Sequence, residues 1–163
     1  MTRQARETPG TGSCTLLGAD LALPGDLPGD HTPAVAAFQR WQQSQVDLWI
    51  DRAVAAGVPR TTRGANLPVP VAVVELPVLS TRWRVGRRLI DGAMTSGIGD
   101  PDVLARTITV YTDVPAFQRS LGIPDSDDVH ALVVTRGGDA LARGHGAPTD
   151  TSWTVVAAAL RAG

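Results

Sequence analysis

Phe38-Gln-Arg-Trp-Gln-Gln-Ser-Gln-Val-Asp-Leu-Trp-Ile50 is the stretch that decides the fold, because it joins a buried strand to an amphipathic helix. The strand is predicted over Thr32–Phe38. The helix is predicted from apolar residues at helical spacing, namely Val46, Trp49, Ile50, Ala53 and Val54. Such a junction is where α/β proteins most often hold their chemistry, because the first helical turn offers free N–H groups. Here it carries glutamines and a tryptophan, with no cysteine, histidine or glycine-rich loop.

The composition is that of one globular domain. The chain has 163 residues, and we place the domain at residues 14–163, after a polar tail at residues 1–13 that we expect to be disordered. The net charge of −1 argues against a nucleic-acid partner. No apolar run is long enough to span a bilayer, and the N-terminus lacks the apolar segment of a signal peptide. We therefore expect a cytoplasmic protein without a membrane partner.

The first half of the chain is predicted to add a hairpin, a second buried strand and a second helix. Residues 14–23 alternate loosely beside turn-forming residues, which predicts one or two short strands. The Val/Leu-rich run at residues 68–79 predicts a strand buried on both faces, in which Glu75 must be paired, protonated or at a strand end. A helix over residues 84–96 is expected to bury a stripe formed by Val85, Leu89 and Ala93.

The second half repeats this alternation and ends in a hairpin and a helix. Residues 106–112 are rich in β-branched side chains and predict a strand, after which Asp113 is expected to cap a short helix. Apolar runs at residues 130–136 and 139–143 flank a Gly-Gly pair, which is a strong hairpin signal. A last helix is predicted to begin at Thr149.

Alternating strands and helices require parallel pairing through right-handed crossovers, and the last hairpin adds antiparallel strands. The predicted fold class is therefore α/β. More specifically, we expect a single-domain, three-layer α/β/α sandwich with a mixed central sheet and an N-terminal β-hairpin.

This order of elements resembles the thioredoxin-like fold, and more narrowly its peroxiredoxin and thiol-reductase branch. The matching stretches are residues 20–26 at the opening, 35–38 in the first core strand and 133–146 in the last hairpin. The resemblance implies a functional crevice at the start of the first long helix, where redox-active relatives carry a Cys-x-x-Cys motif or one peroxidatic cysteine. Here Trp41-Gln-Gln-Ser-Gln45 stands at that point. Without a thiolate there, we expect neither a thiol–disulfide oxidoreductase nor a cysteine peroxidase, and the single Cys14 cannot form an internal disulfide.

The carboxyl ends of the parallel strands are expected to gather polar and aromatic side chains into this crevice. The predicted ligand-binding residues are Trp41, Gln42, Gln43, Gln45, Ser80, Thr81, Arg82, Trp83 and Tyr111. The tryptophans would either wall an apolar pocket or belong to the core, and the glutamines would either orient a ligand or form a solvated first turn. His130 is the best acid–base candidate, with Asp113 as its partner unless Asp113 is only a helix cap. No residues have metal-ligand spacing, so we expect neither a metal nor a cofactor.

Several functions remain open from the sequence. The first is a non-redox thioredoxin-fold protein that binds a small apolar or aromatic molecule, or a partner peptide, in the crevice. The second is a non-thiol enzyme of an isomerase, cyclase or hydrolase type, for example in secondary metabolism. It would use His130 with Asp113 or Asp128 as acid–base groups and Arg82 to hold an anion. The third is a structural module that binds protein, including a second copy of this chain as a homodimer.

Overall fold

The computed structural model describes residues 12–15, 20–21, 23, 25–27, 30–59, 73–98, 103 and 106–162. Its strands are β1 (Gly12–Thr15), β2 (Asp20–Leu21), β3 (His31–Ala37), β4 (Val74–Ser80), β5 (Ile108–Thr112), β6 (His130–Thr135) and β7 (Ala140–His145). Its helices, with η for a 3-10 helix, are η1 (Arg40–Gln42), α1 (Gln43–Ala55), η2 (Thr81–Gly86), α2 (Arg87–Ile98), α4 (Val114–Leu121) and α5 (Asp150–Arg161). The seven strands form one sheet in the order β2-β1-β5-β4-β3-β6-β7.

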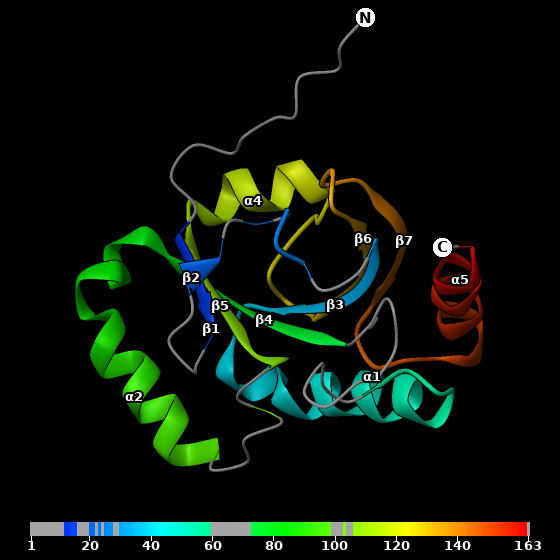
Figure 1. Cartoon of the computed structure of the whole chain (residues 1–163), viewed down its shortest axis with the longest axis horizontal. Coiled ribbons are helices and arrows are strands. Elements are labelled where there is room, and N and C mark those ends of the chain that lie inside the picture. Colours follow the sequence, from blue (N-terminus) through cyan, green and yellow to red (C-terminus); the bar gives the residue numbers. More distant parts are fainter. Residues whose placement is uncertain are drawn as a thin grey trace, which may run out of the picture.

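The sheet is mixed, as predicted. β3, β4 and β5 run parallel, whereas β6 pairs antiparallel with β3 and β1 pairs antiparallel with β5. Figure 1 shows α4 on one side of the sheet and α1 on the other. Each side has its own apolar core, because Ala34 and Ala36 pack with residues of α4 while Val35 packs with residues of α1 and α5. The predicted three-layer α/β/α sandwich is confirmed.

The helix α1 forms where its apolar stripe predicted it, and β3 begins and ends one residue earlier than expected. The buried residues of α1, at helical spacing, are Val46, Trp49, Ile50 and Ala53. Gly57 follows the helix with a φ of 95°, the left-handed conformation that commonly ends a helix. On β7, Gly144 has to be a glycine, since a Cβ there would come within 2.6 Å of the Trp49 ring. The indole N–H of Trp49 donates to the Gly146 carbonyl at 2.7 Å.

Both predicted hairpins are present. β1 and β2 pair antiparallel, and β1 begins at Gly12, inside the segment predicted as a tail; residues 1–11 lie outside the described residues. β6 and β7 pair antiparallel around a turn in which Gly138 has a φ of 90°. The strand expected over residues 68–79 is β4, which extends to Ser80, and residues 60–72 lie outside the described parts.

The prediction for the second helix was partly wrong. Leu89 is 81% exposed and Ala93 is also exposed, so neither is buried as expected. The predicted stripe assumed one α-helix, but Val85 lies in η2, where three residues per turn change its phase relative to Leu89 and Ala93 on α2. The side chain of Val85 lies outside the described parts. Among the α2 side chains that the structure describes, the partly covered apolar ones are Ile90 and Met94.

Candidate functional site

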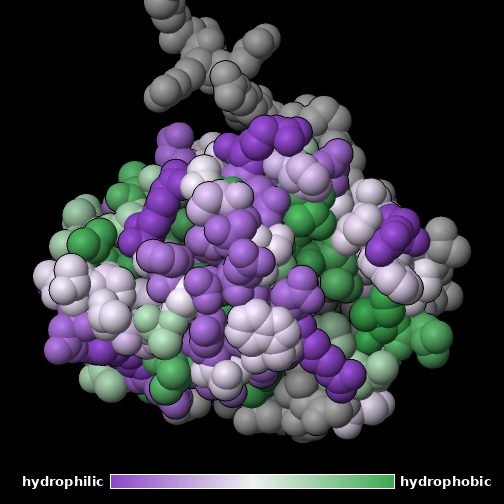
Figure 2. All heavy atoms as spheres, turned by 180° about the vertical axis from the view of Figure 1, so that it is seen from behind, coloured by the Kyte–Doolittle hydropathy of each residue, from purple (hydrophilic) through white to green (hydrophobic). Residues whose placement is uncertain are grey.

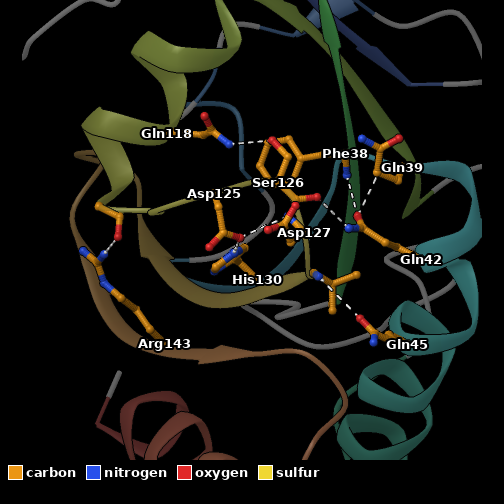
Figure 3. Close-up of polar contacts among 12 residues, drawn as sticks. Phe38, Gln39, Gln42, Gln45, Gln118, Asp125, Ser126, Asp127, His130 and Arg143 are labelled. Atoms are coloured by element: carbon orange, nitrogen blue, oxygen red, sulfur yellow. Dashed lines mark hydrogen bonds and ion pairs between the residues drawn. The ribbon is translucent and has the colours of Figure 1, made fainter.

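The candidate site lies at the end of the sheet at which β3 ends and its antiparallel neighbour β6 begins (Figure 3). There, β3 leads through η1 into α1, and a short loop before β6 comes close to that junction. The register pairs Ala36 with His130, so the first residue of β6 lies beside the last residues of β3. The predicted junction and the predicted histidine are therefore brought together.

Gln42 connects the two segments and is completely buried. Its Oε1 accepts hydrogen bonds from the backbone N–H groups of Phe38, at 2.8 Å, and Gln39, at 3.1 Å. Its Nε2 donates to the Ser126 carbonyl at 2.9 Å, across 84 positions of sequence (Figure 3). All these bonds are internal, so we withdraw Gln42 as a ligand-binding residue and assign it the role of holding the junction to the loop.

The other two glutamines are also bonded to the protein. Gln45 Oε1 lies 3.5 Å from the Val129 backbone nitrogen, as a long hydrogen bond to the residue before β6. Gln43 is exposed, and its Nε2 donates to Asp47 at 3.0 Å and to Glu75 at 3.4 Å. The first turn of α1 is thus neither a set of free amides nor simply solvated.

Both tryptophans of the predicted site are exposed. Trp41 is 60% exposed and Trp83 is 48% exposed, so core packing does not account for either ring. The guanidinium carbon of Arg82 lies 5.3 Å from the centroid of the Trp83 ring, which is cation–π geometry. Of the remaining predicted residues, Ser80 is partly buried and Thr81 is exposed.

Tyr111 in β5 is completely buried, unlike the exposed tryptophans. A ligand has no access to its side chain in this conformation. We therefore withdraw Tyr111 from the ligand-binding set and assign it to the core.

His130 is buried between two aromatic rings. Its ring centroid lies 6.4 Å from that of Phe38, edge to face, and 6.3 Å from that of His145, stacked. Its Nε2 is buried and has no hydrogen-bond partner among the described residues. Burial lowers the pKa of His130 below its usual value of 6.5, and the charges of His145 and Arg143 act in the same direction.

The carboxylate beside His130 is Asp125, which the sequence did not single out. Asp125 Oδ1 lies 4.0 Å from His130 Nε2, and Asp125 and then Asp128 raise the pKa of His130 against the effect of burial. The acidic run just before His130, Pro124-Asp-Ser-Asp-Asp128, was the signal that could have identified Asp125.

Asp113 is not part of this group. Its Oδ1 accepts a hydrogen bond from the Ala116 backbone N–H at 2.9 Å, so it caps α4, as the sequence allowed. Asp113 follows β5, and β4 and β3 lie between β5 and β6. Three strand spacings amount to roughly 14 Å. The predicted His130–Asp113 pair is therefore wrong.

Glu75 forms a buried ion pair beneath α1. Its Oε1 lies 3.1 Å from Arg106 Nε, and both side chains are almost fully buried. Burial raises the pKa of Glu75, and the charge and hydrogen bond of Arg106 oppose that shift. Of the three states predicted for this carboxylate, pairing is the one observed.

The described residues form neither a metal site nor a membrane-spanning helix. Within them, no group of three or more His, Cys, Asp or Glu side chains could hold a metal ion, and no helix is long and apolar enough to cross a membrane. The single cysteine, Cys14, lies in β1, which β5 and β4 separate from β3. It is therefore remote from the start of α1.

The lowered pKa of His130 makes the stability of the protein depend on pH. The unfolded chain binds a proton near pH 6.5, while the folded chain binds it only at a lower pH. The stability that the neutral His130 contributes is thus fully present above pH 6.5, and it is lost as the pH falls through the pKa of His130 in the folded protein. We expect urea unfolding between pH 7.5 and pH 5 to show this loss in the wild type and not in His130→Phe. The same pH dependence in both proteins would contradict the assignment.

Comparison with solved structures gives two similar folds. The pneumococcal exposed lipoprotein thioredoxin of Streptococcus pneumoniae has a TM-score of 0.52 and 10% identity, over 88% of this chain and 93% of that chain. BsSco, a member of the Sco family of cytochrome c oxidase assembly proteins, has a TM-score of 0.54 and 12% identity, over 93% of this chain and 90% of that chain. No protein-family model and no curated protein matches the sequence. This chain therefore has a thioredoxin-like fold, and its single cysteine, Cys14, lies in β1 rather than at the start of α1.

Proposed function

We propose that this protein is a non-redox thioredoxin-fold module that binds a segment of a partner polypeptide. The binding surface lies at the end of the sheet at which β3 leads into η1 and β4 leads into η2. The observation that carries the proposal is the exposure of two tryptophans at that end, 60% for Trp41 and 48% for Trp83. They follow β3 and β4, which are neighbouring parallel strands, so both come after the same ends of the strands. Tryptophan is among the residues that contribute most to binding energy at protein interfaces.

The backbone turn that carries Trp41 is held in place by Gln42, the residue that follows it. Gln42 is fixed by three hydrogen bonds, so the η1 turn that presents Trp41 is tied to β3 and to the loop before β6. An anchor that is already positioned loses less conformational freedom on binding, which favours affinity. Leu48, further along α1, is another exposed apolar side chain.

The polar contacts at the junction favour a polypeptide over a small molecule. The amide of Gln42, which a small ligand in the crevice would use, is engaged with the backbone of Phe38, Gln39 and Ser126. Exposed apolar side chains instead suit a broad contact on the surface. Figure 2 shows one face of the molecule, on which hydrophobic side chains lie on both sides of a hydrophilic centre.

The test is a selection of peptides from a random displayed library on the wild-type protein, followed by calorimetry with single variants. We expect Trp41→Ala to weaken a selected peptide at least about tenfold, because loss of an interface hot spot typically costs about 2 kcal/mol or more, and about 1.4 kcal/mol is tenfold. Leu141→Ala is the matched control. Leu141 is 47% exposed on β7, the edge strand beyond β6, and its loss should leave affinity within about twofold.

Two results would count against the proposal. One is a selection that yields no peptide with saturable binding. The other is a set of peptides that bind Trp41→Ala and Trp83→Ala as well as the wild type, which would place the binding surface elsewhere. Far-ultraviolet circular dichroism of each variant verifies that the fold is intact.

A further inference from the structure

We infer that the loop Pro124–Asp128, here called the acidic loop, receives an arginine side chain of the partner polypeptide, with His130 as an additional hydrogen-bond acceptor behind it. This inference rests on the proposed function, because it concerns the same end of the sheet. Gln42 Nε2 donates to the Ser126 carbonyl, so the acidic loop is bonded to the turn that presents Trp41. A partner anchored on Trp41 would therefore meet the acidic loop as well.

The loop is strongly acidic on its exposed side. It carries Asp125, Asp127 and Asp128, of which the first two are exposed and the third is partly buried. Figure 3 shows Asp125 and Asp127 beside His130. Among the described residues, Arg143 is an arginine whose charge acts on His130, and its guanidinium donates to the Gly122 carbonyl at 2.7 Å. Three carboxylates against one guanidinium favour a cationic ligand.

His130 supplies an independent observation that points to a ligand. Its side chain is 8% exposed, and its Nε2 has no hydrogen-bond partner among the described residues. A buried polar atom without a partner is costly, so a donor that reaches it gains more than an average hydrogen bond. Asp125 Oδ1 lies 4.0 Å from this nitrogen. That separation is too long for a direct hydrogen bond, but one N–H₂ group between the two atoms could donate to both.

The chemistry of the two acceptors favours arginine. Burial keeps the imidazole of His130 neutral at neutral pH, and in the tautomer with its proton on Nδ1 the Nε2 atom is an acceptor. A guanidinium presents five N–H donors in one plane and pairs with a carboxylate through two of them, which leaves others for a neighbouring acceptor. Half of the Asp125 side chain is exposed, so a guanidinium can reach its carboxylate from solvent.

The experiment is a nuclear magnetic resonance titration of the full chain with N-acetyl-L-argininamide. We expect saturable shifts of the His130 imidazole resonances and of the backbone amides of Ser126 to Val129. Asp125→Asn should raise the dissociation constant about tenfold, because a charge-assisted bond is lost while an Oδ1 acceptor remains for the Asp127 N–H. Asp139→Asn, in the exposed turn between β6 and β7, is the matched control and should change the dissociation constant less than about twofold.

The uncharged citrulline analogue provides the second comparison and should not shift these resonances. Equal binding of the analogue, equal loss in Asp139→Asn, or no saturable shift at His130 would overturn the inference. The two proposals can fail separately. Peptides whose affinity depends on Trp41 but not on an arginine would leave the proposed function standing and refute the arginine site.

Discussion

Replacing Gln42 with leucine is expected to destabilise the protein by about 3 kcal/mol, although the two side chains are similar in size. The leucine would leave three backbone groups without their partner: the N–H groups of Phe38 and Gln39 and the carbonyl of Ser126. Each unsatisfied buried polar group costs roughly 1–3 kcal/mol, and partial access of water to these groups keeps the sum near the lower end. The measurement is the free energy of unfolding from urea denaturation.

Gln118→Leu is the matched control for this substitution. Gln118 Nε2 donates to Ser126 Oγ at 2.7 Å, so the control removes one bond to the same loop from a partly exposed residue. Its cost should stay below about 1.5 kcal/mol. Equal losses in the two variants would show that Gln42 does not have the positioning role assigned to it. Amide exchange of the acidic loop gives a second readout, since protection there should fall in Gln42→Leu.

Much of the fold could be predicted because its signals are local. The spacing of Val46, Trp49, Ile50 and Ala53 predicted α1 and its buried face, and the Gly-Gly pair predicted the last hairpin. The failure at α2 was local too. The sequence pattern assumed 3.6 residues per turn from residue 84, but Val85 lies in the 3-10 turn of η2, and Leu89 on α2 is exposed.

The candidate site was harder to predict because its contacts join residues far apart in the sequence. Nothing near Gln42 indicates that its amide donates to Ser126, 84 positions away. Asp113 and Asp125 are both carboxylates in loops, and only the strand order shows that the first lies beyond β4 and β3 while the second lies beside His130. Periodicity predicts which face of an element is buried, but it does not predict which polar partners meet there.

The second large effect is expected at the ion pair beneath α1. Arg106→Leu should cost about 3–5 kcal/mol at pH 7, because it leaves the carboxylate of Glu75 buried without its partner. The folded pKa of Glu75, already raised by burial, should rise further once Arg106 no longer opposes that shift. Because the pKa of Glu75 is higher in the folded variant than in the unfolded chain, folding of the variant is favoured at low pH, where Glu75 is protonated. That advantage is lost as the pH rises and Glu75 ionises. The variant should therefore be closer to the wild type at pH 5 than at pH 7.

Two comparisons separate this effect from a simple change in packing. The double variant Glu75→Leu/Arg106→Leu removes both charges and should recover most of the stability, since a buried ion pair can often be replaced by apolar residues at little cost. Arg52→Leu breaks the exposed pair of Arg52 with Asp150 and should cost less than about 1 kcal/mol at either pH. A double variant as unstable as Arg106→Leu, or a single variant whose loss did not depend on pH, would mean that Arg106 stabilises the protein by packing rather than by pairing with Glu75. With the expected result, Arg106 would stabilise the protein by compensating the buried charge of Glu75.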